Sequence, residues 1–369
     1  MNHISFKSIF VAFFIFILIL PIFIKEIGIY SSSNTENRIL SSPPEWKDKA
    51  LKDFSKEFDI YFKENFGGRD IFYKIYNYIL LNFFNSSPLS ERVIIGHGGW
   101  YFLGNFFSNE ANESIGLNKF SNEEKQKILL GLQNKKKQLD SLGIQSYFCI
   151  AQNKSSIYPE YLPYKVVNTT SKFLDLQYFL KRNNVNLINL TRDIAELKKT
   201  QQVYDKGDSH WNEYGAYSGY RLLMDEILKN NIDAGIKVAF ANDLLPSSKE
   251  NEWPDLYKIF NPSKKDTTLT LEFINPPNIV TIPNKLSAPQ NHFNPNFYEY
   301  RYFNNLGKKK VIIVRDSYMN RMMKFCNYSF KETIYLWSGT IDMSIIKAEK
   351  PDIVIFESVE REIESLLSW

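Results

Sequence analysis

The sequence is poor in cysteine and histidine, and this scarcity excludes disulfide-stapled and zinc-dependent classes of protein. Its two cysteines, Cys149 and Cys326, lie far apart in the chain and cannot build a disulfide framework. Neither belongs to a Cys-x-x-Cys motif, and none of the four histidines is paired with another at the spacing of zinc ligands. The sequence therefore predicts two buried free thiols, no metal site and no cofactor.

The sequence also lacks a basic block and a phosphate-binding loop. Its 45 Lys and Arg residues are mixed with 41 Asp and Glu residues, and the net charge of +4 does not indicate nucleic acid as a partner. The glycine-rich turn around His97 is not followed by Gly-Lys-Ser or Gly-Lys-Thr, so we expect a surface turn there. Hydrophobic residues at 44% and charged residues at 23% are typical of a globular chain, and 369 residues can build one large domain or two small ones.

A long apolar run is present near the amino terminus. Residues 9–24 carry no charge, follow Lys7 and precede Lys25. This run is slightly shorter than the about 20 residues of a membrane span, and no Ala-x-Ala cleavage site follows it, although Ser31–Ser33 offers small residues. We interpret residues 1–30 as an uncleaved signal anchor rather than a cleaved signal peptide. The prediction is a single-pass protein of the cytoplasmic (inner) membrane, with its catalytic domain in the periplasm or outside the cell.

The rest of the chain reads as a short linker and one α/β domain. Residues 31–50 are polar and contain Pro43-Pro44, which predicts a linker, and residues 51–369 are assigned to the domain. Ser121 and Glu124 form a capping box at the start of a helix, after which helices and strands alternate. This alternation predicts a mainly parallel sheet flanked by helices, interrupted by a polar insertion around residues 239–308. The main expected helices are 122–142, 170–181, 193–199, 213–229, 318–325 and 342–348, and the main strands are 144–150, 185–190, 311–314, 333–336 and 353–356.

Ser317 is the candidate nucleophile. It follows the apolar strand 311–314 and precedes a predicted helix, and ligands of open α/β sheets bind beyond the carboxyl ends of the strands. A serine at this junction can present its hydroxyl at the edge of the sheet, while backbone N–H groups of Ser317 or Tyr318 face a developing oxyanion. The alternative is that Ser317 only caps the helix, which is a common role for serine.

Asp208 and His210 are the candidate acid and base. They lie two residues apart in a turn before a helix, so the carboxylate can hold the imidazole by Nδ1 and leave Nε2 free for a serine. The alternative is a capping aspartate beside an exposed histidine. Together with Ser317, the pair supplies every side chain of a nucleophile, base and orienting acid.

Several short motifs occur in an order that resembles one family. They include Asp208-x-His210-Trp211 and Arg315-Asp316-Ser317-Tyr318, and they extend from about residue 36 to residue 362. The others are Glu36-Asn37-Arg38, Asn65-Phe66-Gly67-Gly68-Arg69-Asp70, Val93-Ile94-Ile95-Gly96, Gly99-Trp100-Tyr101-Phe102, Asn153-Lys154, Ile157-Tyr158-Pro159-Glu160, Pro351-Asp352-Ile353-Val354-Ile355 and Glu360-Arg361. The chain resembles the SGNH-hydrolase-like proteins of bacterial polysaccharide O-acetylation, the AlgX/AlgJ-like group.

This resemblance implies an SGNH-hydrolase-like fold and a Ser317–His210–Asp208 triad. It also implies transfer of acetyl groups to a carbohydrate hydroxyl, with a membrane-bound O-acyltransferase as the partner that supplies them. The sequence departs from the family pattern at Arg315, where the family usually has glycine, and at Tyr318, where it usually has phenylalanine. Arg315 either crowds the turn before the nucleophile or brings a cation toward the substrate.

Four further residues of the matched motifs are candidates for substrate binding or for support of the site. Trp211 follows the base directly. Lys154 and Tyr158 come after the strand 144–150 and Arg361 after the strand 353–356, so all three belong to the same sheet edge as the nucleophile. The structural alternative for each of them is a salt bridge or a loop anchor.

The predicted function is O-acetylation of an exported polysaccharide through an acetyl-enzyme at Ser317. With water as acceptor the same residues would form an acetyl esterase. A third possibility is a non-catalytic carbohydrate-binding or assembly subunit of an acetylation complex, which Arg315 favours. The complete set of Ser, His and Asp favours an enzyme.

Overall fold

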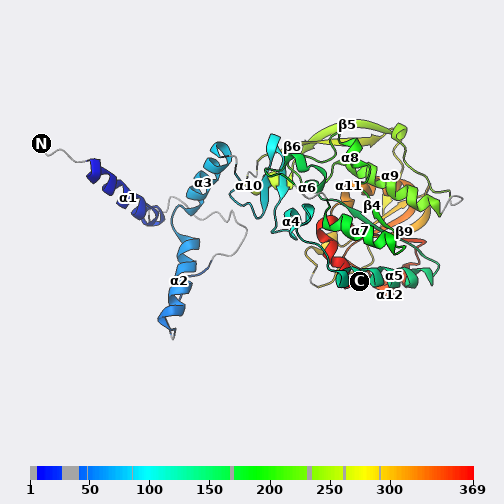
Figure 1. Cartoon of the computed structure of the whole chain (residues 1–369), viewed down its shortest axis with the longest axis horizontal. Helices are drawn as coiled ribbons and strands as arrows, with labels where there is room; N and C mark the ends of the chain where they lie inside the picture. Colours follow the sequence, from blue (N-terminus) through cyan, green and yellow to red (C-terminus); the bar gives the residue numbers. More distant parts are fainter. Residues whose placement is uncertain are drawn as a thin grey trace. The chain divides into compact units, whose positions relative to one another are not determined.

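The computed structural model describes residues 6–26, 41–47, 49–84, 86–166, 170–230, 235–260, 263–290 and 292–369. The chain divides into two compact units, Met1–Pro88 and Leu89–Trp369 (Figure 1). The predicted linker and the predicted start of the domain at residue 51 stay predictions.

The regular secondary structure described in the first unit is helical. It contains α1 (Phe6–Glu26), α2 (Leu51–Asn65) and α3 (Arg69–Phe83). In α2, phenylalanines four residues apart stack along one side, with ring centroids 6.1 Å apart between Phe54 and Phe58 and 6.2 Å apart between Phe58 and Phe62. This spacing is that of neighbouring side chains on a helix surface.

The predicted membrane location is wrong. The apolar run forms most of α1, but none of the helices in the described part of the chain combines the length and apolarity needed to cross a membrane. Its uncharged stretch of 16 residues would rise roughly 24 Å as a helix, less than a hydrocarbon core of about 30 Å. This finding contradicts a single-pass anchor in the cytoplasmic membrane.

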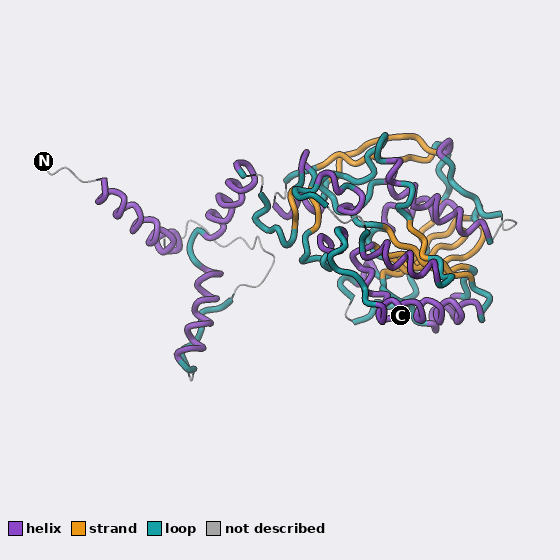
Figure 2. Tube along the Cα trace, viewed as in Figure 1, coloured by secondary structure: helices purple, strands orange, loops and turns teal. Residues whose placement is uncertain are grey.

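The second unit is built around a mixed seven-stranded sheet (Figure 2). Five neighbouring strands run parallel, and two more add to one edge in antiparallel pairings. In spatial order the strands are β4 (Leu187–Asn189), β3 (Gln145–Ala151), β11 (Ile353–Val359), β9 (Lys308–Arg315), β10 (Phe330–Trp337), β8 (Glu299–Asn304) and β7 (Ile279–Thr281). The predicted α/β class is confirmed, and the sheet, predicted to be mainly parallel, is a mixed one in which five neighbouring strands are parallel.

Helices cover both faces of this sheet. Because successive side chains of a strand point to opposite faces, β9 feeds two cores: Val311 and Ile313 belong to one, and Ile312 and Val314 to the other. The first core includes α9 (Glu213–Lys229) and α11 (Met319–Ser329). The second includes α5 (Asn122–Asp140), α7 (Lys172–Arg182), α12 (Met343–Glu349) and the 3-10 helix η6 (Glu360–Ser368).

The remaining elements are short. The helices are α4 (Glu110–Ser114), α6 (Lys154–Ile157), α8 (Ile194–Leu197) and α10 (Asp255–Phe260). Two ribbons of two strands pair β1 (Val93–Ile95) with β2 (Tyr101–Leu103), and β5 (Leu244–Asn251) with β6 (Asp266–Phe273). Single 3-10 turns are η1 (His97–Gly99), η2 (Pro159–Tyr161), η4 (Ala241–Asp243) and η5 (Pro295–Phe297).

Local sequence signals are confirmed where they are strongest. Ser121 and Glu124 make the predicted capping box, α9 has the predicted bounds, and Cys149 and Cys326 are buried free thiols. The region 239–308 is more regular than a polar insertion, because it holds β5, β6, α10, β7 and β8. Six consecutive residues of β5 are exposed, which explains why its sequence lacks the apolar alternation of a half-buried strand.

Candidate functional site

The site begins at the carboxyl end of β9. Ser317 lies between β9 and α11, and its Oγ is 2.8 Å from Nε2 of His210. The helix starts at Met319 with Tyr318 in the capping position and no side-chain cap. Ser317 is therefore not the helix cap, and its hydroxyl is directed to the imidazole.

Asp208 and His210 come from the long loop between α8 and α9. Oδ1 of Asp208 accepts hydrogen bonds from His210 Nδ1, at 2.8 Å, and from the His210 backbone N–H, at 3.0 Å. The other carboxylate oxygen accepts from the side-chain amide of Asn251 at 3.0 Å. The cap of α9 is Asn212, so Asp208 is not a capping residue.

Electrostatic interactions stabilise the charged forms of Asp208 and His210. Burial alone would raise the pKa of Asp208, but its hydrogen bonds and the charge of His210 hold it well below its ordinary value. Burial lowers the pKa of His210, yet the bond and charge of Asp208 and the charge of Asp255 outweigh burial, so the pKa of His210 is raised. The environment thus stabilises an imidazolium, which is the form that a base reaches after it takes a proton.

The two loops of the site are locked to each other by hydrogen bonds. Tyr318 donates its hydroxyl hydrogen to the carbonyl of Ser209 at 2.8 Å, and Trp211 Nε1 donates to the carbonyl of Tyr318 at 2.9 Å. Both side chains are fully buried. Trp211 and Tyr318, which the sequence marks as candidates, therefore hold the turn of Ser317 against the loop of His210.

Lys154 anchors the loop between α8 and α9, which carries Asp208 and is called the acid loop below. It lies on α6, is 1% exposed, and its Nζ donates to the carbonyls of Lys206 at 2.7 Å and Asp208 at 3.0 Å. Burial lowers the pKa of Lys154 to about 8. Tyr158 has a similar role, because its hydroxyl accepts the backbone N–H of Val203 at 3.1 Å, at the start of the same loop.

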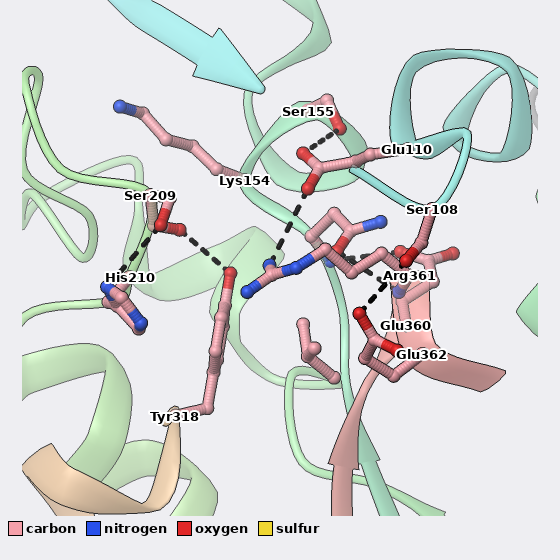
Figure 3. A network of polar contacts seen from close by, with 12 residues as sticks. Ser108, Glu110, Lys154, Ser155, Ser209, His210, Tyr318, Glu360, Arg361 and Glu362 are labelled. Carbon is pink, nitrogen blue, oxygen red and sulfur yellow. Dashed lines mark hydrogen bonds and ion pairs between the residues drawn. The ribbon is translucent and has the colours of Figure 1, made fainter. Parts of the chain in front are cut away.

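Arg361 reaches the site from η6. Its guanidinium lies 5.3 Å from the centre of the Tyr318 ring and 3.5 Å from the buried carboxylate of Glu110. Figure 3 shows this contact continuing through Glu110 to Ser155 of α6, and the bond from Tyr318 to Ser209 beside His210. Burial disfavours a charged arginine, but the tyrosine and the carboxylates around it raise its pKa. Arg361 is a largely buried cation beside the turn that carries Ser317.

One of the two expectations was that Arg315 crowds the turn before Ser317. Its side chain packs on Trp337 instead. Its side chain is 1% exposed, lies 4.2 Å from the centre of the Trp337 ring, and donates to Asn320 Oδ1 at 3.0 Å. It lines a pocket of about 260 Å³ together with Ser317, Trp337 and Arg361. Arg315 is thus one of the residues that line the pocket beside Ser317, and its guanidinium is buried against the Trp337 ring.

The backbone of the nucleophile turn offers one N–H group. Tyr318 N–H donates to Asp316 Oδ1 at 2.8 Å, and the other oxygen of Asp316 accepts from the Val359 N–H. In the described part of the chain, the Ser317 N–H donates to no hydrogen-bond acceptor. Of the two expected oxyanion donors, only the Ser317 N–H is available.

Asn251 and Asp255 were not predicted as site residues from the sequence. They lie at the end of β5 and the start of α10, inside the region interpreted as a polar insertion, and no motif marks them. Asp208, His210 and Asp255 have donor atoms within 4.8 Å of one another, a set of nitrogen and oxygen ligands that a cation could use. A cation there would compete with the Asp208–His210 hydrogen bond for Nδ1.

Residues 93–272 match the family model described as the SGNH hydrolase-like domain of the acetyltransferase AlgX. None of the curated proteins gave a match. Among solved structures, PatB1 of Bacillus cereus superposes with a TM-score of 0.54 at 18% identity, over 73% of this chain and 97% of PatB1. A DHHW family protein of Eubacterium siraeum gives 0.53 at 13% identity, over 75% and 98% of the two chains. The O-acetyltransferase domain of Pseudomonas putida AlgJ gives 0.46 at 15% identity, over 74% and 92%.

The resemblance to the AlgX/AlgJ-like group is thereby confirmed, and the first two superpositions show a shared fold alone. Asp208 and His210 lie inside the matched segment, whereas Ser317 lies after it.

Proposed function

We propose, on the premise that residues 93–272 belong to the AlgX-type SGNH hydrolase-like acetyltransferases, that this chain is an O-acetyltransferase of a polysaccharide. The observation that carries the proposal is the continuous hydrogen-bonded series Ser317 Oγ, His210 and Asp208, with both bonds 2.8 Å long. The proposed roles are nucleophile, general base and orienting acid.

The reaction has two halves. His210 Nε2 takes the Ser317 hydroxyl proton while Oγ attacks the carbonyl carbon of an acetyl donor. The negative charge of the tetrahedral intermediate faces the Ser317 N–H, and the imidazolium returns its proton to the leaving group of the donor. In the second half, His210 takes the proton of a sugar hydroxyl while the sugar oxygen attacks the acetyl carbon. The bond from that carbon to Ser317 Oγ then breaks, the imidazolium returns its proton to Oγ, and the O-acetyl sugar leaves.

The pocket beside Ser317 is the proposed place for the reacting groups. Trp337 supplies an aromatic wall, Arg315 supplies a buried cation and Arg361 supplies a largely buried one. Aromatic faces suit the apolar side of a sugar ring, and hydroxyl groups suit guanidinium donors. The proposed partner is a membrane-bound O-acyltransferase that delivers the acetyl group, and the proposed acceptor is a polysaccharide hydroxyl.

The first experiment replaces Ser317 with Ala. Incubation of the wild-type protein with 4-nitrophenyl acetate should give a mass increase of one acetyl group on the Ser317 peptide and release of nitrophenol. Ser317→Ala should lack the adduct and lose on the order of a thousandfold or more in rate, as loss of a triad nucleophile does. Ser338→Ala, which changes another serine of the same pocket, is the matched control. An unchanged rate in Ser317→Ala would overturn the proposal.

Transfer and hydrolysis are then distinguished by the acceptor. With a transferase, added oligosaccharide should speed nitrophenol release and take up acetyl groups that mass spectrometry detects. With an acetyl esterase, acetate is the product whether or not sugar is present. The feature that favoured a non-catalytic subunit was Arg315, and its contacts with Trp337 and Asn320 support the catalytic alternative.

A further inference from the structure

A second carboxylate faces the same nitrogen of His210 as Asp208 does. Oδ2 of Asp255 lies 3.8 Å from His210 Nδ1, compared with 2.8 Å for Oδ1 of Asp208. Ser209 bridges the gap: its hydroxyl donates to Asp255 Oδ2 at 2.5 Å and its oxygen lies 3.4 Å from Nδ1. The Ser209 N–H also donates to the other Asp255 oxygen at 2.7 Å.

The fold holds Asp255 firmly in this place. It is the first residue of α10, and the next two backbone N–H groups of that helix, from Leu256 and Tyr257, donate to the carbonyl of Gly207 at 3.0 and 3.1 Å. A Cβ added at Gly207 would meet the Tyr257 ring at 2.3 Å, so α10 sits directly on the acid loop. The Asp255 side chain is nevertheless 42% exposed, so water reaches it more readily than the buried Asp208.

We propose that Asp255 is a positioning residue for His210, an auxiliary acid that shares the orienting role of Asp208 through Ser209. This inference rests on the proposed function. In a triad with a single acid, the carboxylate fixes the imidazole tautomer and stabilises the imidazolium. Here two carboxylates and one hydroxyl converge on Nδ1, so the same two tasks are divided between a buried acid and a half-exposed one.

Several other groups surround His210 and set the balance of charge. Arg361 of η6 opposes protonation of the imidazole, while Asp208 and Asp255 favour it. The Tyr318 ring lies 5.2 Å away, centre to centre, and Lys154 of α6 holds the Asp208 carbonyl. Removal of the Asp255 charge should therefore lower the pKa of His210 and leave Asp208 in place.

The test measures the pH dependence of kcat/KM for 4-nitrophenyl acetate in four full-length proteins: wild type, Asp255→Asn, Asp208→Asn and the double variant. The base must be neutral to act, so kcat/KM rises with pH through the pKa of His210. Asp255→Asn should move this rise to lower pH and reduce the plateau of kcat severalfold, with KM unchanged. Asp208→Asn should retain activity through Asp255 and lose about a hundredfold, whereas the double variant should approach the about ten-thousandfold loss of a triad without an acid.

Asp266→Asn is the comparator for a purely structural role. Asp266 accepts the Gly207 N–H at 2.8 Å and so supports the same loop without facing the imidazole. Its variant should leave the pH profile where it is. An unmoved profile in Asp255→Asn, with Asp208→Asn as inactive as the double variant, would overturn the inference. If the wild-type protein forms no acetyl adduct at Ser317, the proposed function is overturned instead.

Discussion

At the scale of residues, the site combines neighbours in sequence with residues brought from far away. Asp208 and His210 meet through one turn, because the Asp208 carboxylate accepts the backbone N–H two residues on as well as the ring nitrogen. Ser317 is 107 residues from His210, and only the position of β9 in the sheet brings its hydroxyl to Nε2. The first pairing can be predicted from spacing, and the second requires the strand order.

Asp205 carries a prediction at the same scale. It is 1% exposed in the acid loop, and burial raises its pKa to about 7. A carboxyl group whose pKa is raised on folding stabilises the fold fully below about pH 4, and this stabilisation is lost as pH rises through about 7. Asp205→Asn, which stays neutral, should raise the free energy of unfolding at pH 8 by about 1 to 4 kcal/mol.

Urea unfolding of both proteins at pH 8 and pH 5 checks this expectation. The gain should shrink at pH 5, where the native aspartic acid is already mostly protonated. A destabilised Asp205→Asn at pH 8 would mean that the charged form is favoured in the native site. Asp193→Asn, a change at an exposed aspartate before the same loop, serves as the control.

At the scale of elements, the antiparallel strand β8 is fixed to the sheet by a buried ion cluster. Arg301 is fully buried, and its guanidinium contacts Glu299 of the same strand and Glu349 of α12. Bonds from Arg301 and Lys310 lower the pKa of Glu349 to about 2. The cluster ties a strand that the sequence analysis placed inside an irregular insertion to a helix near the end of the chain.

Arg301→Met should destabilise the second unit by about 3 to 5 kcal/mol, because it leaves buried carboxylates without their cation. The pKa of Glu349 is depressed on folding, so the contribution of the pair is present above about pH 4.3 and is lost as pH falls toward 2. Thermal or urea unfolding should therefore show a large difference between the proteins at pH 7 and a smaller one at pH 3. An equal difference at both values would show that packing, not charge, is what the variant loses.

At the scale of the whole molecule, the proposed machinery lies in one of the two units. Ser317, His210, Asp208 and Asp255 all belong to Leu89–Trp369, which also contains both hydrophobic cores of the central sheet. The family match ends at residue 272, so the last part of the chain contributes Ser317 and five strands of that sheet, β7, β8, β9, β10 and β11.

A chain that begins at Leu89 should fold and hydrolyse 4-nitrophenyl acetate with a kcat/KM within about threefold of the full-length protein, because it keeps every core and site residue of the second unit. Circular dichroism should show cooperative unfolding of this shorter chain. Loss of cooperative unfolding would show that the second unit needs residues 1–88 to fold. A folded chain with a rate reduced more than tenfold would assign those residues a part in the reaction.

The sequence by itself determined the features that depend on neighbouring residues. Capping at Ser121, the bounds of α9, the apolar strand before Ser317 and the Asp208–His210 pair follow from spacing and side-chain chemistry over a few positions. The match of residues 93–272 bears out the family resemblance for the segment that holds Asp208 and His210, and Ser317 lies beyond it.

Only the tertiary structure decided which distant groups converge. The antiparallel place of β8, the interlock of Trp211 with Tyr318 and the approach of Asp255 to His210 depend on long-range packing that no local pattern encodes. The same is true of Arg315, whose charge could have faced the nucleophile but lies on Trp337. A side chain's direction is set by the burial and hydrogen bonds available to it, and those exist only once strands and helices from distant parts of the chain have come together.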